Sequence, residues 1–470
     1  MALFCHICGA KLPARLDRKA AIRERKILSL MFAAVMFAIF YTVPFSLNPV
    51  LNRFSNSIGL PYKSGPYGGI LTEIITFSWL LFLAMFVAVN SYQAFWAATG
   101  YDRDGKLRNR GKALATGVCP FLPSVTVVVP AFNEEEHLER TLSTCLNQAY
   151  KNLAEVIVID DGSTDRTAEI ALDFASRDAR LKYFKNISNH GKPFSLNQGF
   201  ARSSSELTFF MDGDSYLELN AVELLVNHFK DPKVAMAASL IAVDNNRSLL
   251  AKMQEIEYFF TQIVARYCQA MEKTVVICPG AGTMVRTAVA RKTHHSARTV
   301  TEDADFTLNV MREWKIVQEP DAVSYTSVPT TWKSWNNQRK RWLYGFLQTI
   351  ILHKWAARKK MWIIWAWLGY LMSPLPAASL CLFPVIFWTF GPRSLVYFAG
   401  YMVVAGFFAW AVHAMPILWH PMPRKHLAFL IPAYILYQQY LNLVQLYCVF
   451  ARALKMGVDV TYGPKKIHAL

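Results

Sequence analysis

The chain alternates between long apolar stretches and one extended block in which short apolar runs are separated by polar turns. Five stretches are apolar over near or above the ~20 residues that a helix needs to cross a bilayer core; they are 27–45, 74–98, 361–390, 394–419 and 427–451. We therefore expect a soluble block between transmembrane helices. The expected organisation is a basic N-terminus (1–26), two transmembrane helices (27–98), a soluble domain (99–330), interfacial helices (331–360), about three transmembrane helices (361–451) and a basic tail (452–470).

The soluble block repeats a β-branched run, a polar turn and an acidic helix start. The segments SVTVVVPAFNEEEHLERTLSTCLNQ (124–148) and AEVIVIDDGSTDRTAEIALDFA (154–175) both follow this pattern, and LTFFMD (207–212) predicts a further strand. Strands that alternate with helices predict a mostly parallel sheet, whose ligand site lies at the carboxyl ends of the strands. The predicted fold class is α/β, and the turns after the first two strands should line one crevice.

Composition and charge connect the block with a membrane surface. The hydrophobic fraction is 53% and the net charge is +17, unevenly distributed: 11–26 carries seven basic and two acidic residues, and 331–360 carries eight basic residues and no acidic one. Basic runs beside apolar segments predict contact with anionic headgroups. The positive-inside tendency places the N-terminus and the soluble block in the cytoplasm. We expect a multi-pass protein of the plasma membrane. The charge tendency leaves the topology after residue 390 open, and no nucleic-acid partner is expected.

The eight cysteines are scattered, and one close pair, Cys5 and Cys8, has the spacing of half a zinc ribbon. A closed zinc site needs four ligands, and the chain offers no second close pair. We interpret the pair as free thiols, with a zinc site shared between two chains as the alternative.

Polar residues recur at helical spacing in the last apolar segment, at Gln438, Asn442 and Gln445. Such residues face protein or a water-filled cavity. We favour hydrogen bonding between helices over the lining of a path through the membrane.

Asp212 and Asp214 are the first candidates for chemistry. Strand alternation would direct both side chains to one side, and Gly213 between them would let a ligand approach the backbone. Paired carboxylate oxygens suit a hard cation such as Mg²⁺ or Mn²⁺, which can bridge a diphosphate. Lys192 follows a glycine and precedes a predicted helix, a position that suits contact with phosphate.

Two later stretches carry further candidates. In TVTEDADFT (299–307), the acids fit either a helix cap or a general base, and the stretch alone favours the cap. In WNNQRKRWLYG (335–345), the spacing places Gln338, Arg341 and Trp342 on one helical stripe. A basic interfacial helix is the alternative for that stretch.

Together these stretches resemble the processive, membrane-embedded synthases of glycosyltransferase family 2, which include poly-N-acetylglucosamine, hyaluronan, chitin and cellulose synthases. The motifs occur in the family's order over about 120–350. The resemblance implies a cytoplasmic glycosyltransferase A-type, Rossmann-like domain inserted between transmembrane helices. It also implies that the uridine diphosphate (UDP) of the donor is held by Ala131, Glu134 and Asp161, that Lys192 meets the diphosphate, and that Asp212 and Asp214 bind the nucleotide sugar through Mg²⁺ or Mn²⁺.

The resemblance also implies the reaction. Asp303 would be the catalytic base, while Gln338, Arg341 and Trp342 would seat the nucleotide and the growing chain; CPGAGTMVR (278–286) matches an acceptor-lining region more loosely. The implied enzyme is a hexosyltransferase: a processive, inverting β-glycosyltransferase that polymerises a UDP-sugar and feeds the product through its own membrane segments. Expected partners are the UDP-sugar donor, the growing polysaccharide acceptor, the lipid bilayer and a small membrane partner subunit.

No single motif determines the sugar. SLNQG, CPGAGTMVR and the two-plus-three arrangement of apolar segments resemble the poly-N-acetylglucosamine and chitin synthases more than cellulose synthase, and this resemblance implies UDP-N-acetylglucosamine as the donor. A cellulose-like glucan synthase using UDP-glucose and a non-processive transferase to a lipid carrier are the alternatives. A transporter or scaffold with a regulatory domain would not explain the ordered motifs.

Overall fold

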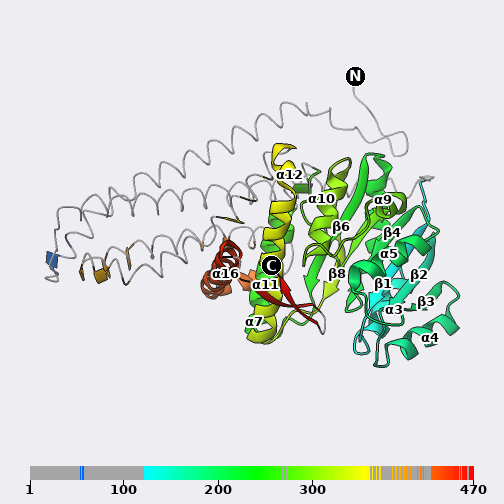
Figure 1. The fold of residues 1–470 in the computed structure, drawn as a ribbon, viewed down its shortest axis with the longest axis horizontal. Helices are drawn as coiled ribbons and strands as arrows, with labels where there is room; N and C mark the ends of the chain where they lie inside the picture. Colours follow the sequence, from blue (N-terminus) through cyan, green and yellow to red (C-terminus); the bar gives the residue numbers. More distant parts are fainter. Residues whose placement is uncertain are drawn as a thin grey trace, which may run out of the picture. The chain divides into compact units, whose positions relative to one another are not determined.

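The computed structural model describes residues 121–359 apart from 267–268 and 271–272, then 425–454, 456, 458–462 and 465–469, and scattered residues within 53–57 and 363–417 (Figure 1). Contacts divide the chain into two compact units, Met1–Trp96 with Leu382–Met415, and Ala97–Cys381 with Pro416–Leu470. The elements below all belong to the second unit. Cys5, Cys8 and the expected membrane segments 27–45 and 74–98 lie outside the described residues, and only scattered residues of 361–390 and 394–419 are described.

The first half of the soluble block alternates strands and helices as the sequence predicts. Its elements are β1 (Val125–Ala131), α3 (Leu138–Leu146), β2 (Leu153–Asp160), α4 (Thr167–Arg177), β3 (Leu181–Lys185), α5 (Lys192–Arg202) and β4 (Leu207–Phe210). β1 pairs in parallel with β2 and with β4, and β2 pairs in parallel with β3. The four strands therefore present their carboxyl ends along one edge.

The second half turns this sheet into a mixed one. Its elements are β5 (Ser215–Leu217), α6 (Ala221–Val226), the 3-10 helix η1 (Asn227–Lys230), β6 (Val234–Val243), α7 (Leu249–Tyr258), the π-helix η2 (Phe259–Arg266), β7 (Thr283–Arg286), α9 (Thr287–Thr293), α10 (Glu302–Met311) and β8 (Lys315–Thr326). The eight strands have the order β3-β2-β1-β4-β7-β6-β8-β5.

The α/β fold class is confirmed, and the described sheet is mostly parallel: β6 and β8 pair in parallel and run in the direction of β4, whereas β7 and β5 run the other way. β7 runs antiparallel to both β4 and β6, and β5 runs antiparallel to β8. The cause is the connection through α7 and η2, which brings the chain back to the end of the sheet where β6 finishes. β7 must then run back along β6.

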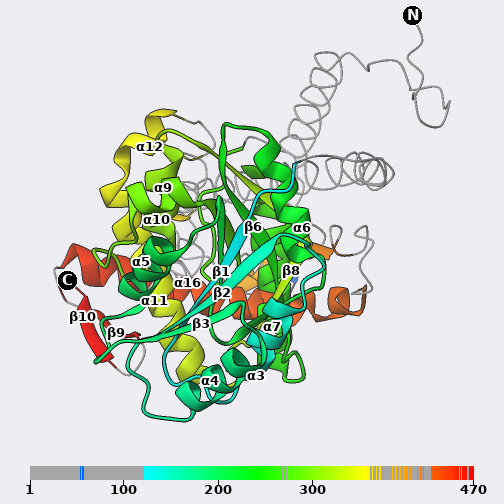
Figure 2. The same ribbon diagram turned by 90° about the vertical axis from the view of Figure 1, so that its right-hand side faces the viewer.

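Helices cover both faces of the sheet (Figure 2). Val127 and Val129 pack in a cluster with Leu138 and Leu142 of α3, whereas Val128 points to the opposite face and packs in a cluster with Phe200 of α5. α3 and α4 lie on one side of the strands, and α5, α9 and α10 lie on the other. Burial on both faces explains why the strand sequences read as continuous β-branched runs rather than as alternating ones.

Two long helices follow the sheet. They are α11 (Trp332–Leu352) and α16 (Ile431–Ala453), with α12 (Lys354–Lys359) and the 3-10 helix η3 (Lys425–Leu430) between them, and a two-stranded hairpin of β9 (Val458–Tyr462) and β10 (Lys465–Ala469) after them. α16 packs along α11 (Figure 1), where the Trp335 ring stacks on Tyr440 with centroids 5.5 Å apart.

α16 coincides with the last apolar segment predicted from the sequence, 427–451. Within the described part of the chain, the stretch His426–Ala453 is the one helix whose length and composition would allow it to cross a bilayer. Asn442 and Gln445 of this helix are buried, and the Gln445 side-chain amide donates to the backbone carbonyl of Tyr370. That contact favours hydrogen bonding between protein segments as the role of the polar stripe.

Candidate active site

The turns after β1 and β2 meet at the carboxyl edge of the sheet, as predicted. The carbonyl of Ala131, the buried last residue of β1, accepts a hydrogen bond from the Asp161 N–H (2.8 Å). The buried Asp161 carboxylate accepts from Asn186 Nδ2 (2.8 Å) and from the backbone N–H of His190 (3.1 Å) and Gly191 (2.6 Å). Asp161 thus ties the turn after β2 to the loop that precedes α5.

Asp212 and Asp214 lie close together, but the strand-alternation argument for this is wrong. β4 ends at Phe210, and Asp212 begins a turn in which its carbonyl accepts from the Ser215 N–H (3.2 Å). The turn brings the two carboxylates together at the same edge. Burial and the neighbouring Asp212 charge raise the pKa of Asp214.

Glu134, in the turn after β1, joins these two carboxylates. Burial, followed by the charges of Asp214 and Asp212, raises the pKa of Glu134 to about 8. Three acids from the turns after β1 and β4 therefore repel one another in a partly desolvated place. Such an arrangement favours either protonation or a bound cation.

Lys192 opens α5 and faces the acids. Its ammonium group forms an ion pair with Asp212 Oδ1 and lies 3.6 Å from Glu302 Oε1. The loop that contains Gly280 also lies against Lys192. A glycine allows this close approach, because a Cβ at position 280 would overlap Lys192 Nζ. Glu302, which is buried, was not predicted as a site residue, and its only sequence signal is its position beside Asp303.

The acids of 302–305 divide between two roles. All lie in the first turn of α10, but the N-cap residue is Thr301, which makes no side-chain capping bond. The Asp305 carboxylate is occupied elsewhere: it accepts from Arg298 Nη2 (2.7 Å) and from His353 Nε2 (2.6 Å). Asp305 therefore fastens α10 to the end of α11.

Asp303 is a partly buried acid whose pKa is raised. Burial and the adjacent Glu302 raise the pKa of Asp303 to about 6, against the opposing effect of Lys192 and Arg341. Its Oδ1 accepts a bond from the Ala304 N–H (2.8 Å). A carboxyl group with this pKa is ionised at neutral pH and basic enough to accept a proton.

The three residues predicted on one stripe of α11, Gln338, Arg341 and Trp342, have different neighbours in the structure. Arg341 is close enough to lower the pKa of Asp303. The Trp342 ring lies 6.4 Å from that of Tyr258, centroid to centroid, whereas the side-chain Oε1 of Gln338 accepts a hydrogen bond from Arg339. The structure thus brings Arg341 near Asp303 and places Trp342 beside an aromatic ring.

Two further residues near the candidate site were not predicted, Tyr258 and Arg266. Tyr258 ends α7, and Arg266 ends the π-helix η2, where it donates to Gln262 Oε1 (3.1 Å) and lies close enough to Asp303 for their charges to interact. Their segment carries no recognisable motif, so nothing in the local sequence singles them out.

The carboxylate oxygens of Asp212 and Asp214 are ligands that suit a hard divalent cation. Within the residues that the structure describes, no group of three or more His, Cys, Asp or Glu side chains is placed to hold a metal ion. Mg²⁺ and Mn²⁺ accept one or two carboxylates and complete their coordination with phosphate oxygens and water. The carboxylates of Glu134, Asp212 and Asp214 repel one another, and a bound divalent cation would relieve this repulsion. The residues present therefore fit a metal ion.

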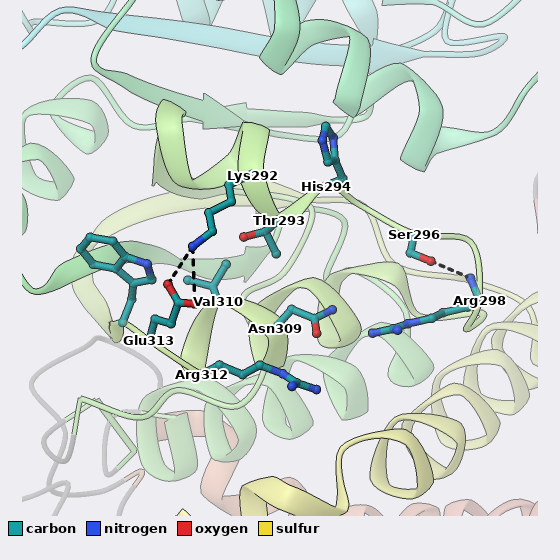
Figure 3. A pocket seen from close by; sticks show the side chains of 10 residues that line it. Lys292, Thr293, His294, Ser296, Arg298, Asn309, Val310, Arg312 and Glu313 are labelled. Atoms are coloured by element: carbon teal, nitrogen blue, oxygen red, sulfur yellow. Dashed lines mark hydrogen bonds and ion pairs between the residues drawn. The ribbon is translucent and has the colours of Figure 1, made fainter.

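A separate cavity of about 390 Å³ lies at the ends of α9 and α10 (Figure 3). Lys292 points across it and forms an ion pair with Glu313 (3.1 Å). None of the predicted site residues lines this cavity.

Comparisons with known proteins match most of the part of the chain that forms the sheet and its helices. The family described as "Glycosyl transferase family 2" matches residues 126–293. A probable glycosyltransferase, YdaM of Bacillus subtilis, is 30% identical over 232 residues, which cover 48% of this chain and 55% of that protein. The poly-beta-1,6-N-acetyl-D-glucosamine synthase of Staphylococcus aureus strain COL is 30% identical over 227 residues, covering 48% and 55%.

The corresponding synthase of Staphylococcus epidermidis strain RP62A is 27% identical over 238 residues, covering 50% of this chain and 57% of that protein. The chain thus spans about half the length of the curated relatives it matches. Among solved structures, the mannosyltransferase PcManGT from Pyrobaculum calidifontis in complex with GDP-Man and Mn²⁺ aligns with a TM-score of 0.46 and 19% identity, over 80% of this chain and 98% of that one.

Proposed function

Since residues 126–293 form a glycosyltransferase family 2 domain, we propose that the whole chain is a processive, inverting β-glycosyltransferase that polymerises a UDP-activated sugar. The expected class of enzyme, a glycosyltransferase, is confirmed at the level of this domain. Processivity, the donor and the roles of the individual residues are our proposals. UDP-N-acetylglucosamine is the proposed donor, and the growing polysaccharide is the proposed acceptor.

One observation carries the proposal: Asp303, a carboxyl group with a pKa of about 6, interacts electrostatically with both Lys192 and Arg341. Lys192 reaches in turn to Asp212, so a proton acceptor and a cationic group stand beside the proposed diphosphate site. A sugar transfer needs this combination, because a hydroxyl must lose its proton while charge develops on the leaving group.

The proposed reaction is a single displacement. The Asp303 carboxylate accepts the proton of the acceptor hydroxyl, whose oxygen attacks the anomeric carbon as the bond from that carbon to the diphosphate breaks. Lys192 stabilises the negative charge on the departing UDP. One in-line displacement inverts the anomeric configuration, so an α-linked donor gives a β-linked product.

Asp212 and Asp214 are the proposed ligands of Mg²⁺ or Mn²⁺, which would neutralise the diphosphate when bound. Ala131, Glu134 and Asp161 are the proposed nucleotide contacts, with Gln338 and Arg341 beside them. Because Asp161 already accepts several hydrogen bonds from the loop before α5, we assign it the shaping of this pocket as well as direct contact.

Polymerisation and membrane location rest on α11 and α16. Trp342 would form a flat apolar platform on which the terminal sugar of the acceptor stacks. α16 exposes a row of large apolar side chains, including Leu436, Leu443 and Phe450, which suits contact with lipid. We therefore propose a multi-pass plasma-membrane enzyme with a cytoplasmic catalytic domain and product export through its own membrane segments.

The choice of donor follows the relatives. Two of them are named poly-beta-1,6-N-acetyl-D-glucosamine synthases, which supports N-acetylglucosamine over the glucose of a cellulose-like glucan synthase. The experiment is a panel of UDP-sugars tested with purified membranes and read by UDP release. Fastest release from UDP-N-acetylglucosamine supports this donor, and fastest release from UDP-glucose contradicts it.

A further inference from the structure

Arg339 occupies a position between the predicted site residues Gln338 and Arg341, and its side chain is almost completely buried. Its guanidinium donates from Nη2 to Glu257 Oε2 of α7 (2.7 Å) and from Nη1 to the side-chain oxygen of Gln338. Among the described residues of α7 and α11, Glu257 is the acid that forms an ion pair with Arg339. A buried guanidinium in such a geometry is strongly held, because its planar fork loses both hydrogen bonds and charge compensation if it moves.

The same carboxylate reaches the apolar helix α16. The Tyr437 hydroxyl donates to Glu257 Oε2 and accepts from Trp335 Nε1 of α11 (2.8 Å). Arg339 Nη2 also lies 3.4 Å from the Tyr437 oxygen. The group of Glu257, Trp335, Arg339 and Tyr437, called here the Arg339 network, therefore joins α7, α11 and α16.

Aromatic contacts extend the network to the proposed acceptor platform. The Arg339 guanidinium lies between two tryptophan rings of α11, 5.5 Å from the centroid of Trp335 and 4.4 Å from that of Trp342. Trp342 also lies beside Tyr258, the residue that follows Glu257. A cation stacked on an aromatic face limits the orientations of both groups. The position of the Trp342 ring is therefore set through Arg339 by α7 and α16.

We propose that Arg339 is a positioning residue, which couples the place of helix α16 to the orientation of Trp342 and thereby determines how long the acceptor chain is retained. The inference rests on the proposed polymerase function. Arg339 itself contacts neither donor nor acceptor; it acts through Trp342. The arrangement gives the membrane-facing helix a direct mechanical link to the end of the growing chain.

The test uses the full-length protein in lipid nanodiscs and two variants. Tyr437→Phe removes one hydroxyl and keeps the ring, and Arg339→Lys keeps the charge but loses the planar fork. Tyr447→Phe is the matched control, because Tyr447 lies on α16 outside the network and its ring contact with Lys340 survives the change. UDP affinity, mean product length and hydrogen exchange of the backbone amides 335–345 are measured on each preparation.

Tyr437→Phe should keep UDP affinity unchanged while mean product length falls by about tenfold, the effect on an equilibrium of losing a hydrogen bond to a charged group. Arg339→Lys also loses the bond to Gln338, a proposed nucleotide contact, so it should shorten the product and lower UDP affinity as well. Exchange of amides 335–345 should accelerate, and Tyr447→Phe should match wild type in all three measurements. Unchanged product length in the folded network variants would overturn the proposal. So would a parallel fall of UDP affinity and product length in Tyr437→Phe, since a purely structural role damages both.

Failure of the proposed function gives a different result. If wild-type protein transfers a single sugar and makes no polymer, the polymerase proposal fails, and the amide exchange decides the positioning role alone. Faster exchange in Tyr437→Phe and Arg339→Lys would then support the coupling of α16 to α11, and wild-type exchange would overturn it.

Discussion

The ammonium group of Lys192 forms an ion pair with the carboxylate of Asp212, which joins the first residue of α5 to the turn after β4. The two residues come from successive elements of the parallel half of the sheet, whose carboxyl ends share one edge. A donor diphosphate bound here would attract the Lys192 cation away from Asp212 and leave that carboxylate to a metal. The ion pair is therefore the expected resting form of the donor site.

The acid pair gives the first prediction. Asp214→Asn should abolish transfer while the protein stays folded in the membrane, since an amide cannot replace a carboxylate under a divalent cation. Chelation should abolish activity in wild type, and added Mn²⁺ or Mg²⁺ should restore it. Asp173→Asn, which alters an exposed ion pair on α4, is the control and should be fully active. Activity that survives exhaustive chelation would remove the metal from the account.

Asp303 gives the second prediction. Asp303→Asn should still bind UDP, but turnover should fall by at least ~100-fold, the usual contribution of a general base. The base works as the carboxylate, so with a pKa of about 6 wild-type turnover should be flat above that pH and fall as the pH is lowered through it. A profile flat down to pH 5, or an active Asp303→Asn enzyme, would contradict the role.

Asp305→Asn is the matched control for this change, because Asp305 is a structural acid in the same turn. It accepts from Arg298 and His353, and hydrogen bonds to charged groups contribute about 1.5–3 kcal/mol each. Asp305→Asn should therefore lower the free energy of unfolding and leave the pH profile of turnover unchanged. Thermal unfolding and turnover of the two variants should separate catalysis from stability.

Two glycines in one loop give the third prediction. In Gly280→Ala the new methyl group would overlap Lys192 Nζ, the flexible end of a side chain, so the protein should fold with Lys192 displaced and UDP affinity reduced. In Gly282→Ala the methyl group would meet the hydroxyl oxygens of Ser239 and Ser324, which are buried, so stability should fall. Calorimetric UDP binding and thermal unfolding check both; wild-type UDP affinity in Gly280→Ala would place Lys192 outside the donor site.

The fourth prediction concerns Trp342. Trp342→Ala should lose polymer formation and keep UDP binding, because Asp161, Lys192 and the proposed metal ligands lie on other elements, and slow hydrolysis of the donor by water should remain. Trp342→Phe preserves an apolar ring and should keep part of the polymer length. Product sizing beside UDP affinity distinguishes this role from simple anchoring of a helix, and wild-type product length in folded Trp342→Ala would contradict it.

Much of the parallel half of the fold was readable from the sequence because its signals are local. The runs that form β1 and β2 are β-branched, buried on both faces and followed by polar turns, so each strand, turn and helix could be predicted from its own residues. The antiparallel β7 could not, since its direction depends on where the connection through α7 and η2 returns. That is a property of tertiary packing rather than of any short segment.

Some residues of the candidate site could be singled out from the sequence and others could not. Lys192, Asp212 and Asp303 lie in short motifs with distinctive chemistry, and the structure brings their elements to one edge. The role of Asp305 was hidden, because its partners Arg298 and His353 are recognised only once α10 and α11 are packed. Tyr258 remained hidden for the same reason, since it meets Trp342 across two helices.

The most direct test of the central claim is the size of the product made by purified membranes from labelled UDP-N-acetylglucosamine at low donor conversion. A processive polymerase retains each acceptor through many additions, so we predict long chains from the earliest time points, with one UDP released per sugar incorporated. A labelled lipid carrying a single sugar, or no transfer at all, would contradict the account.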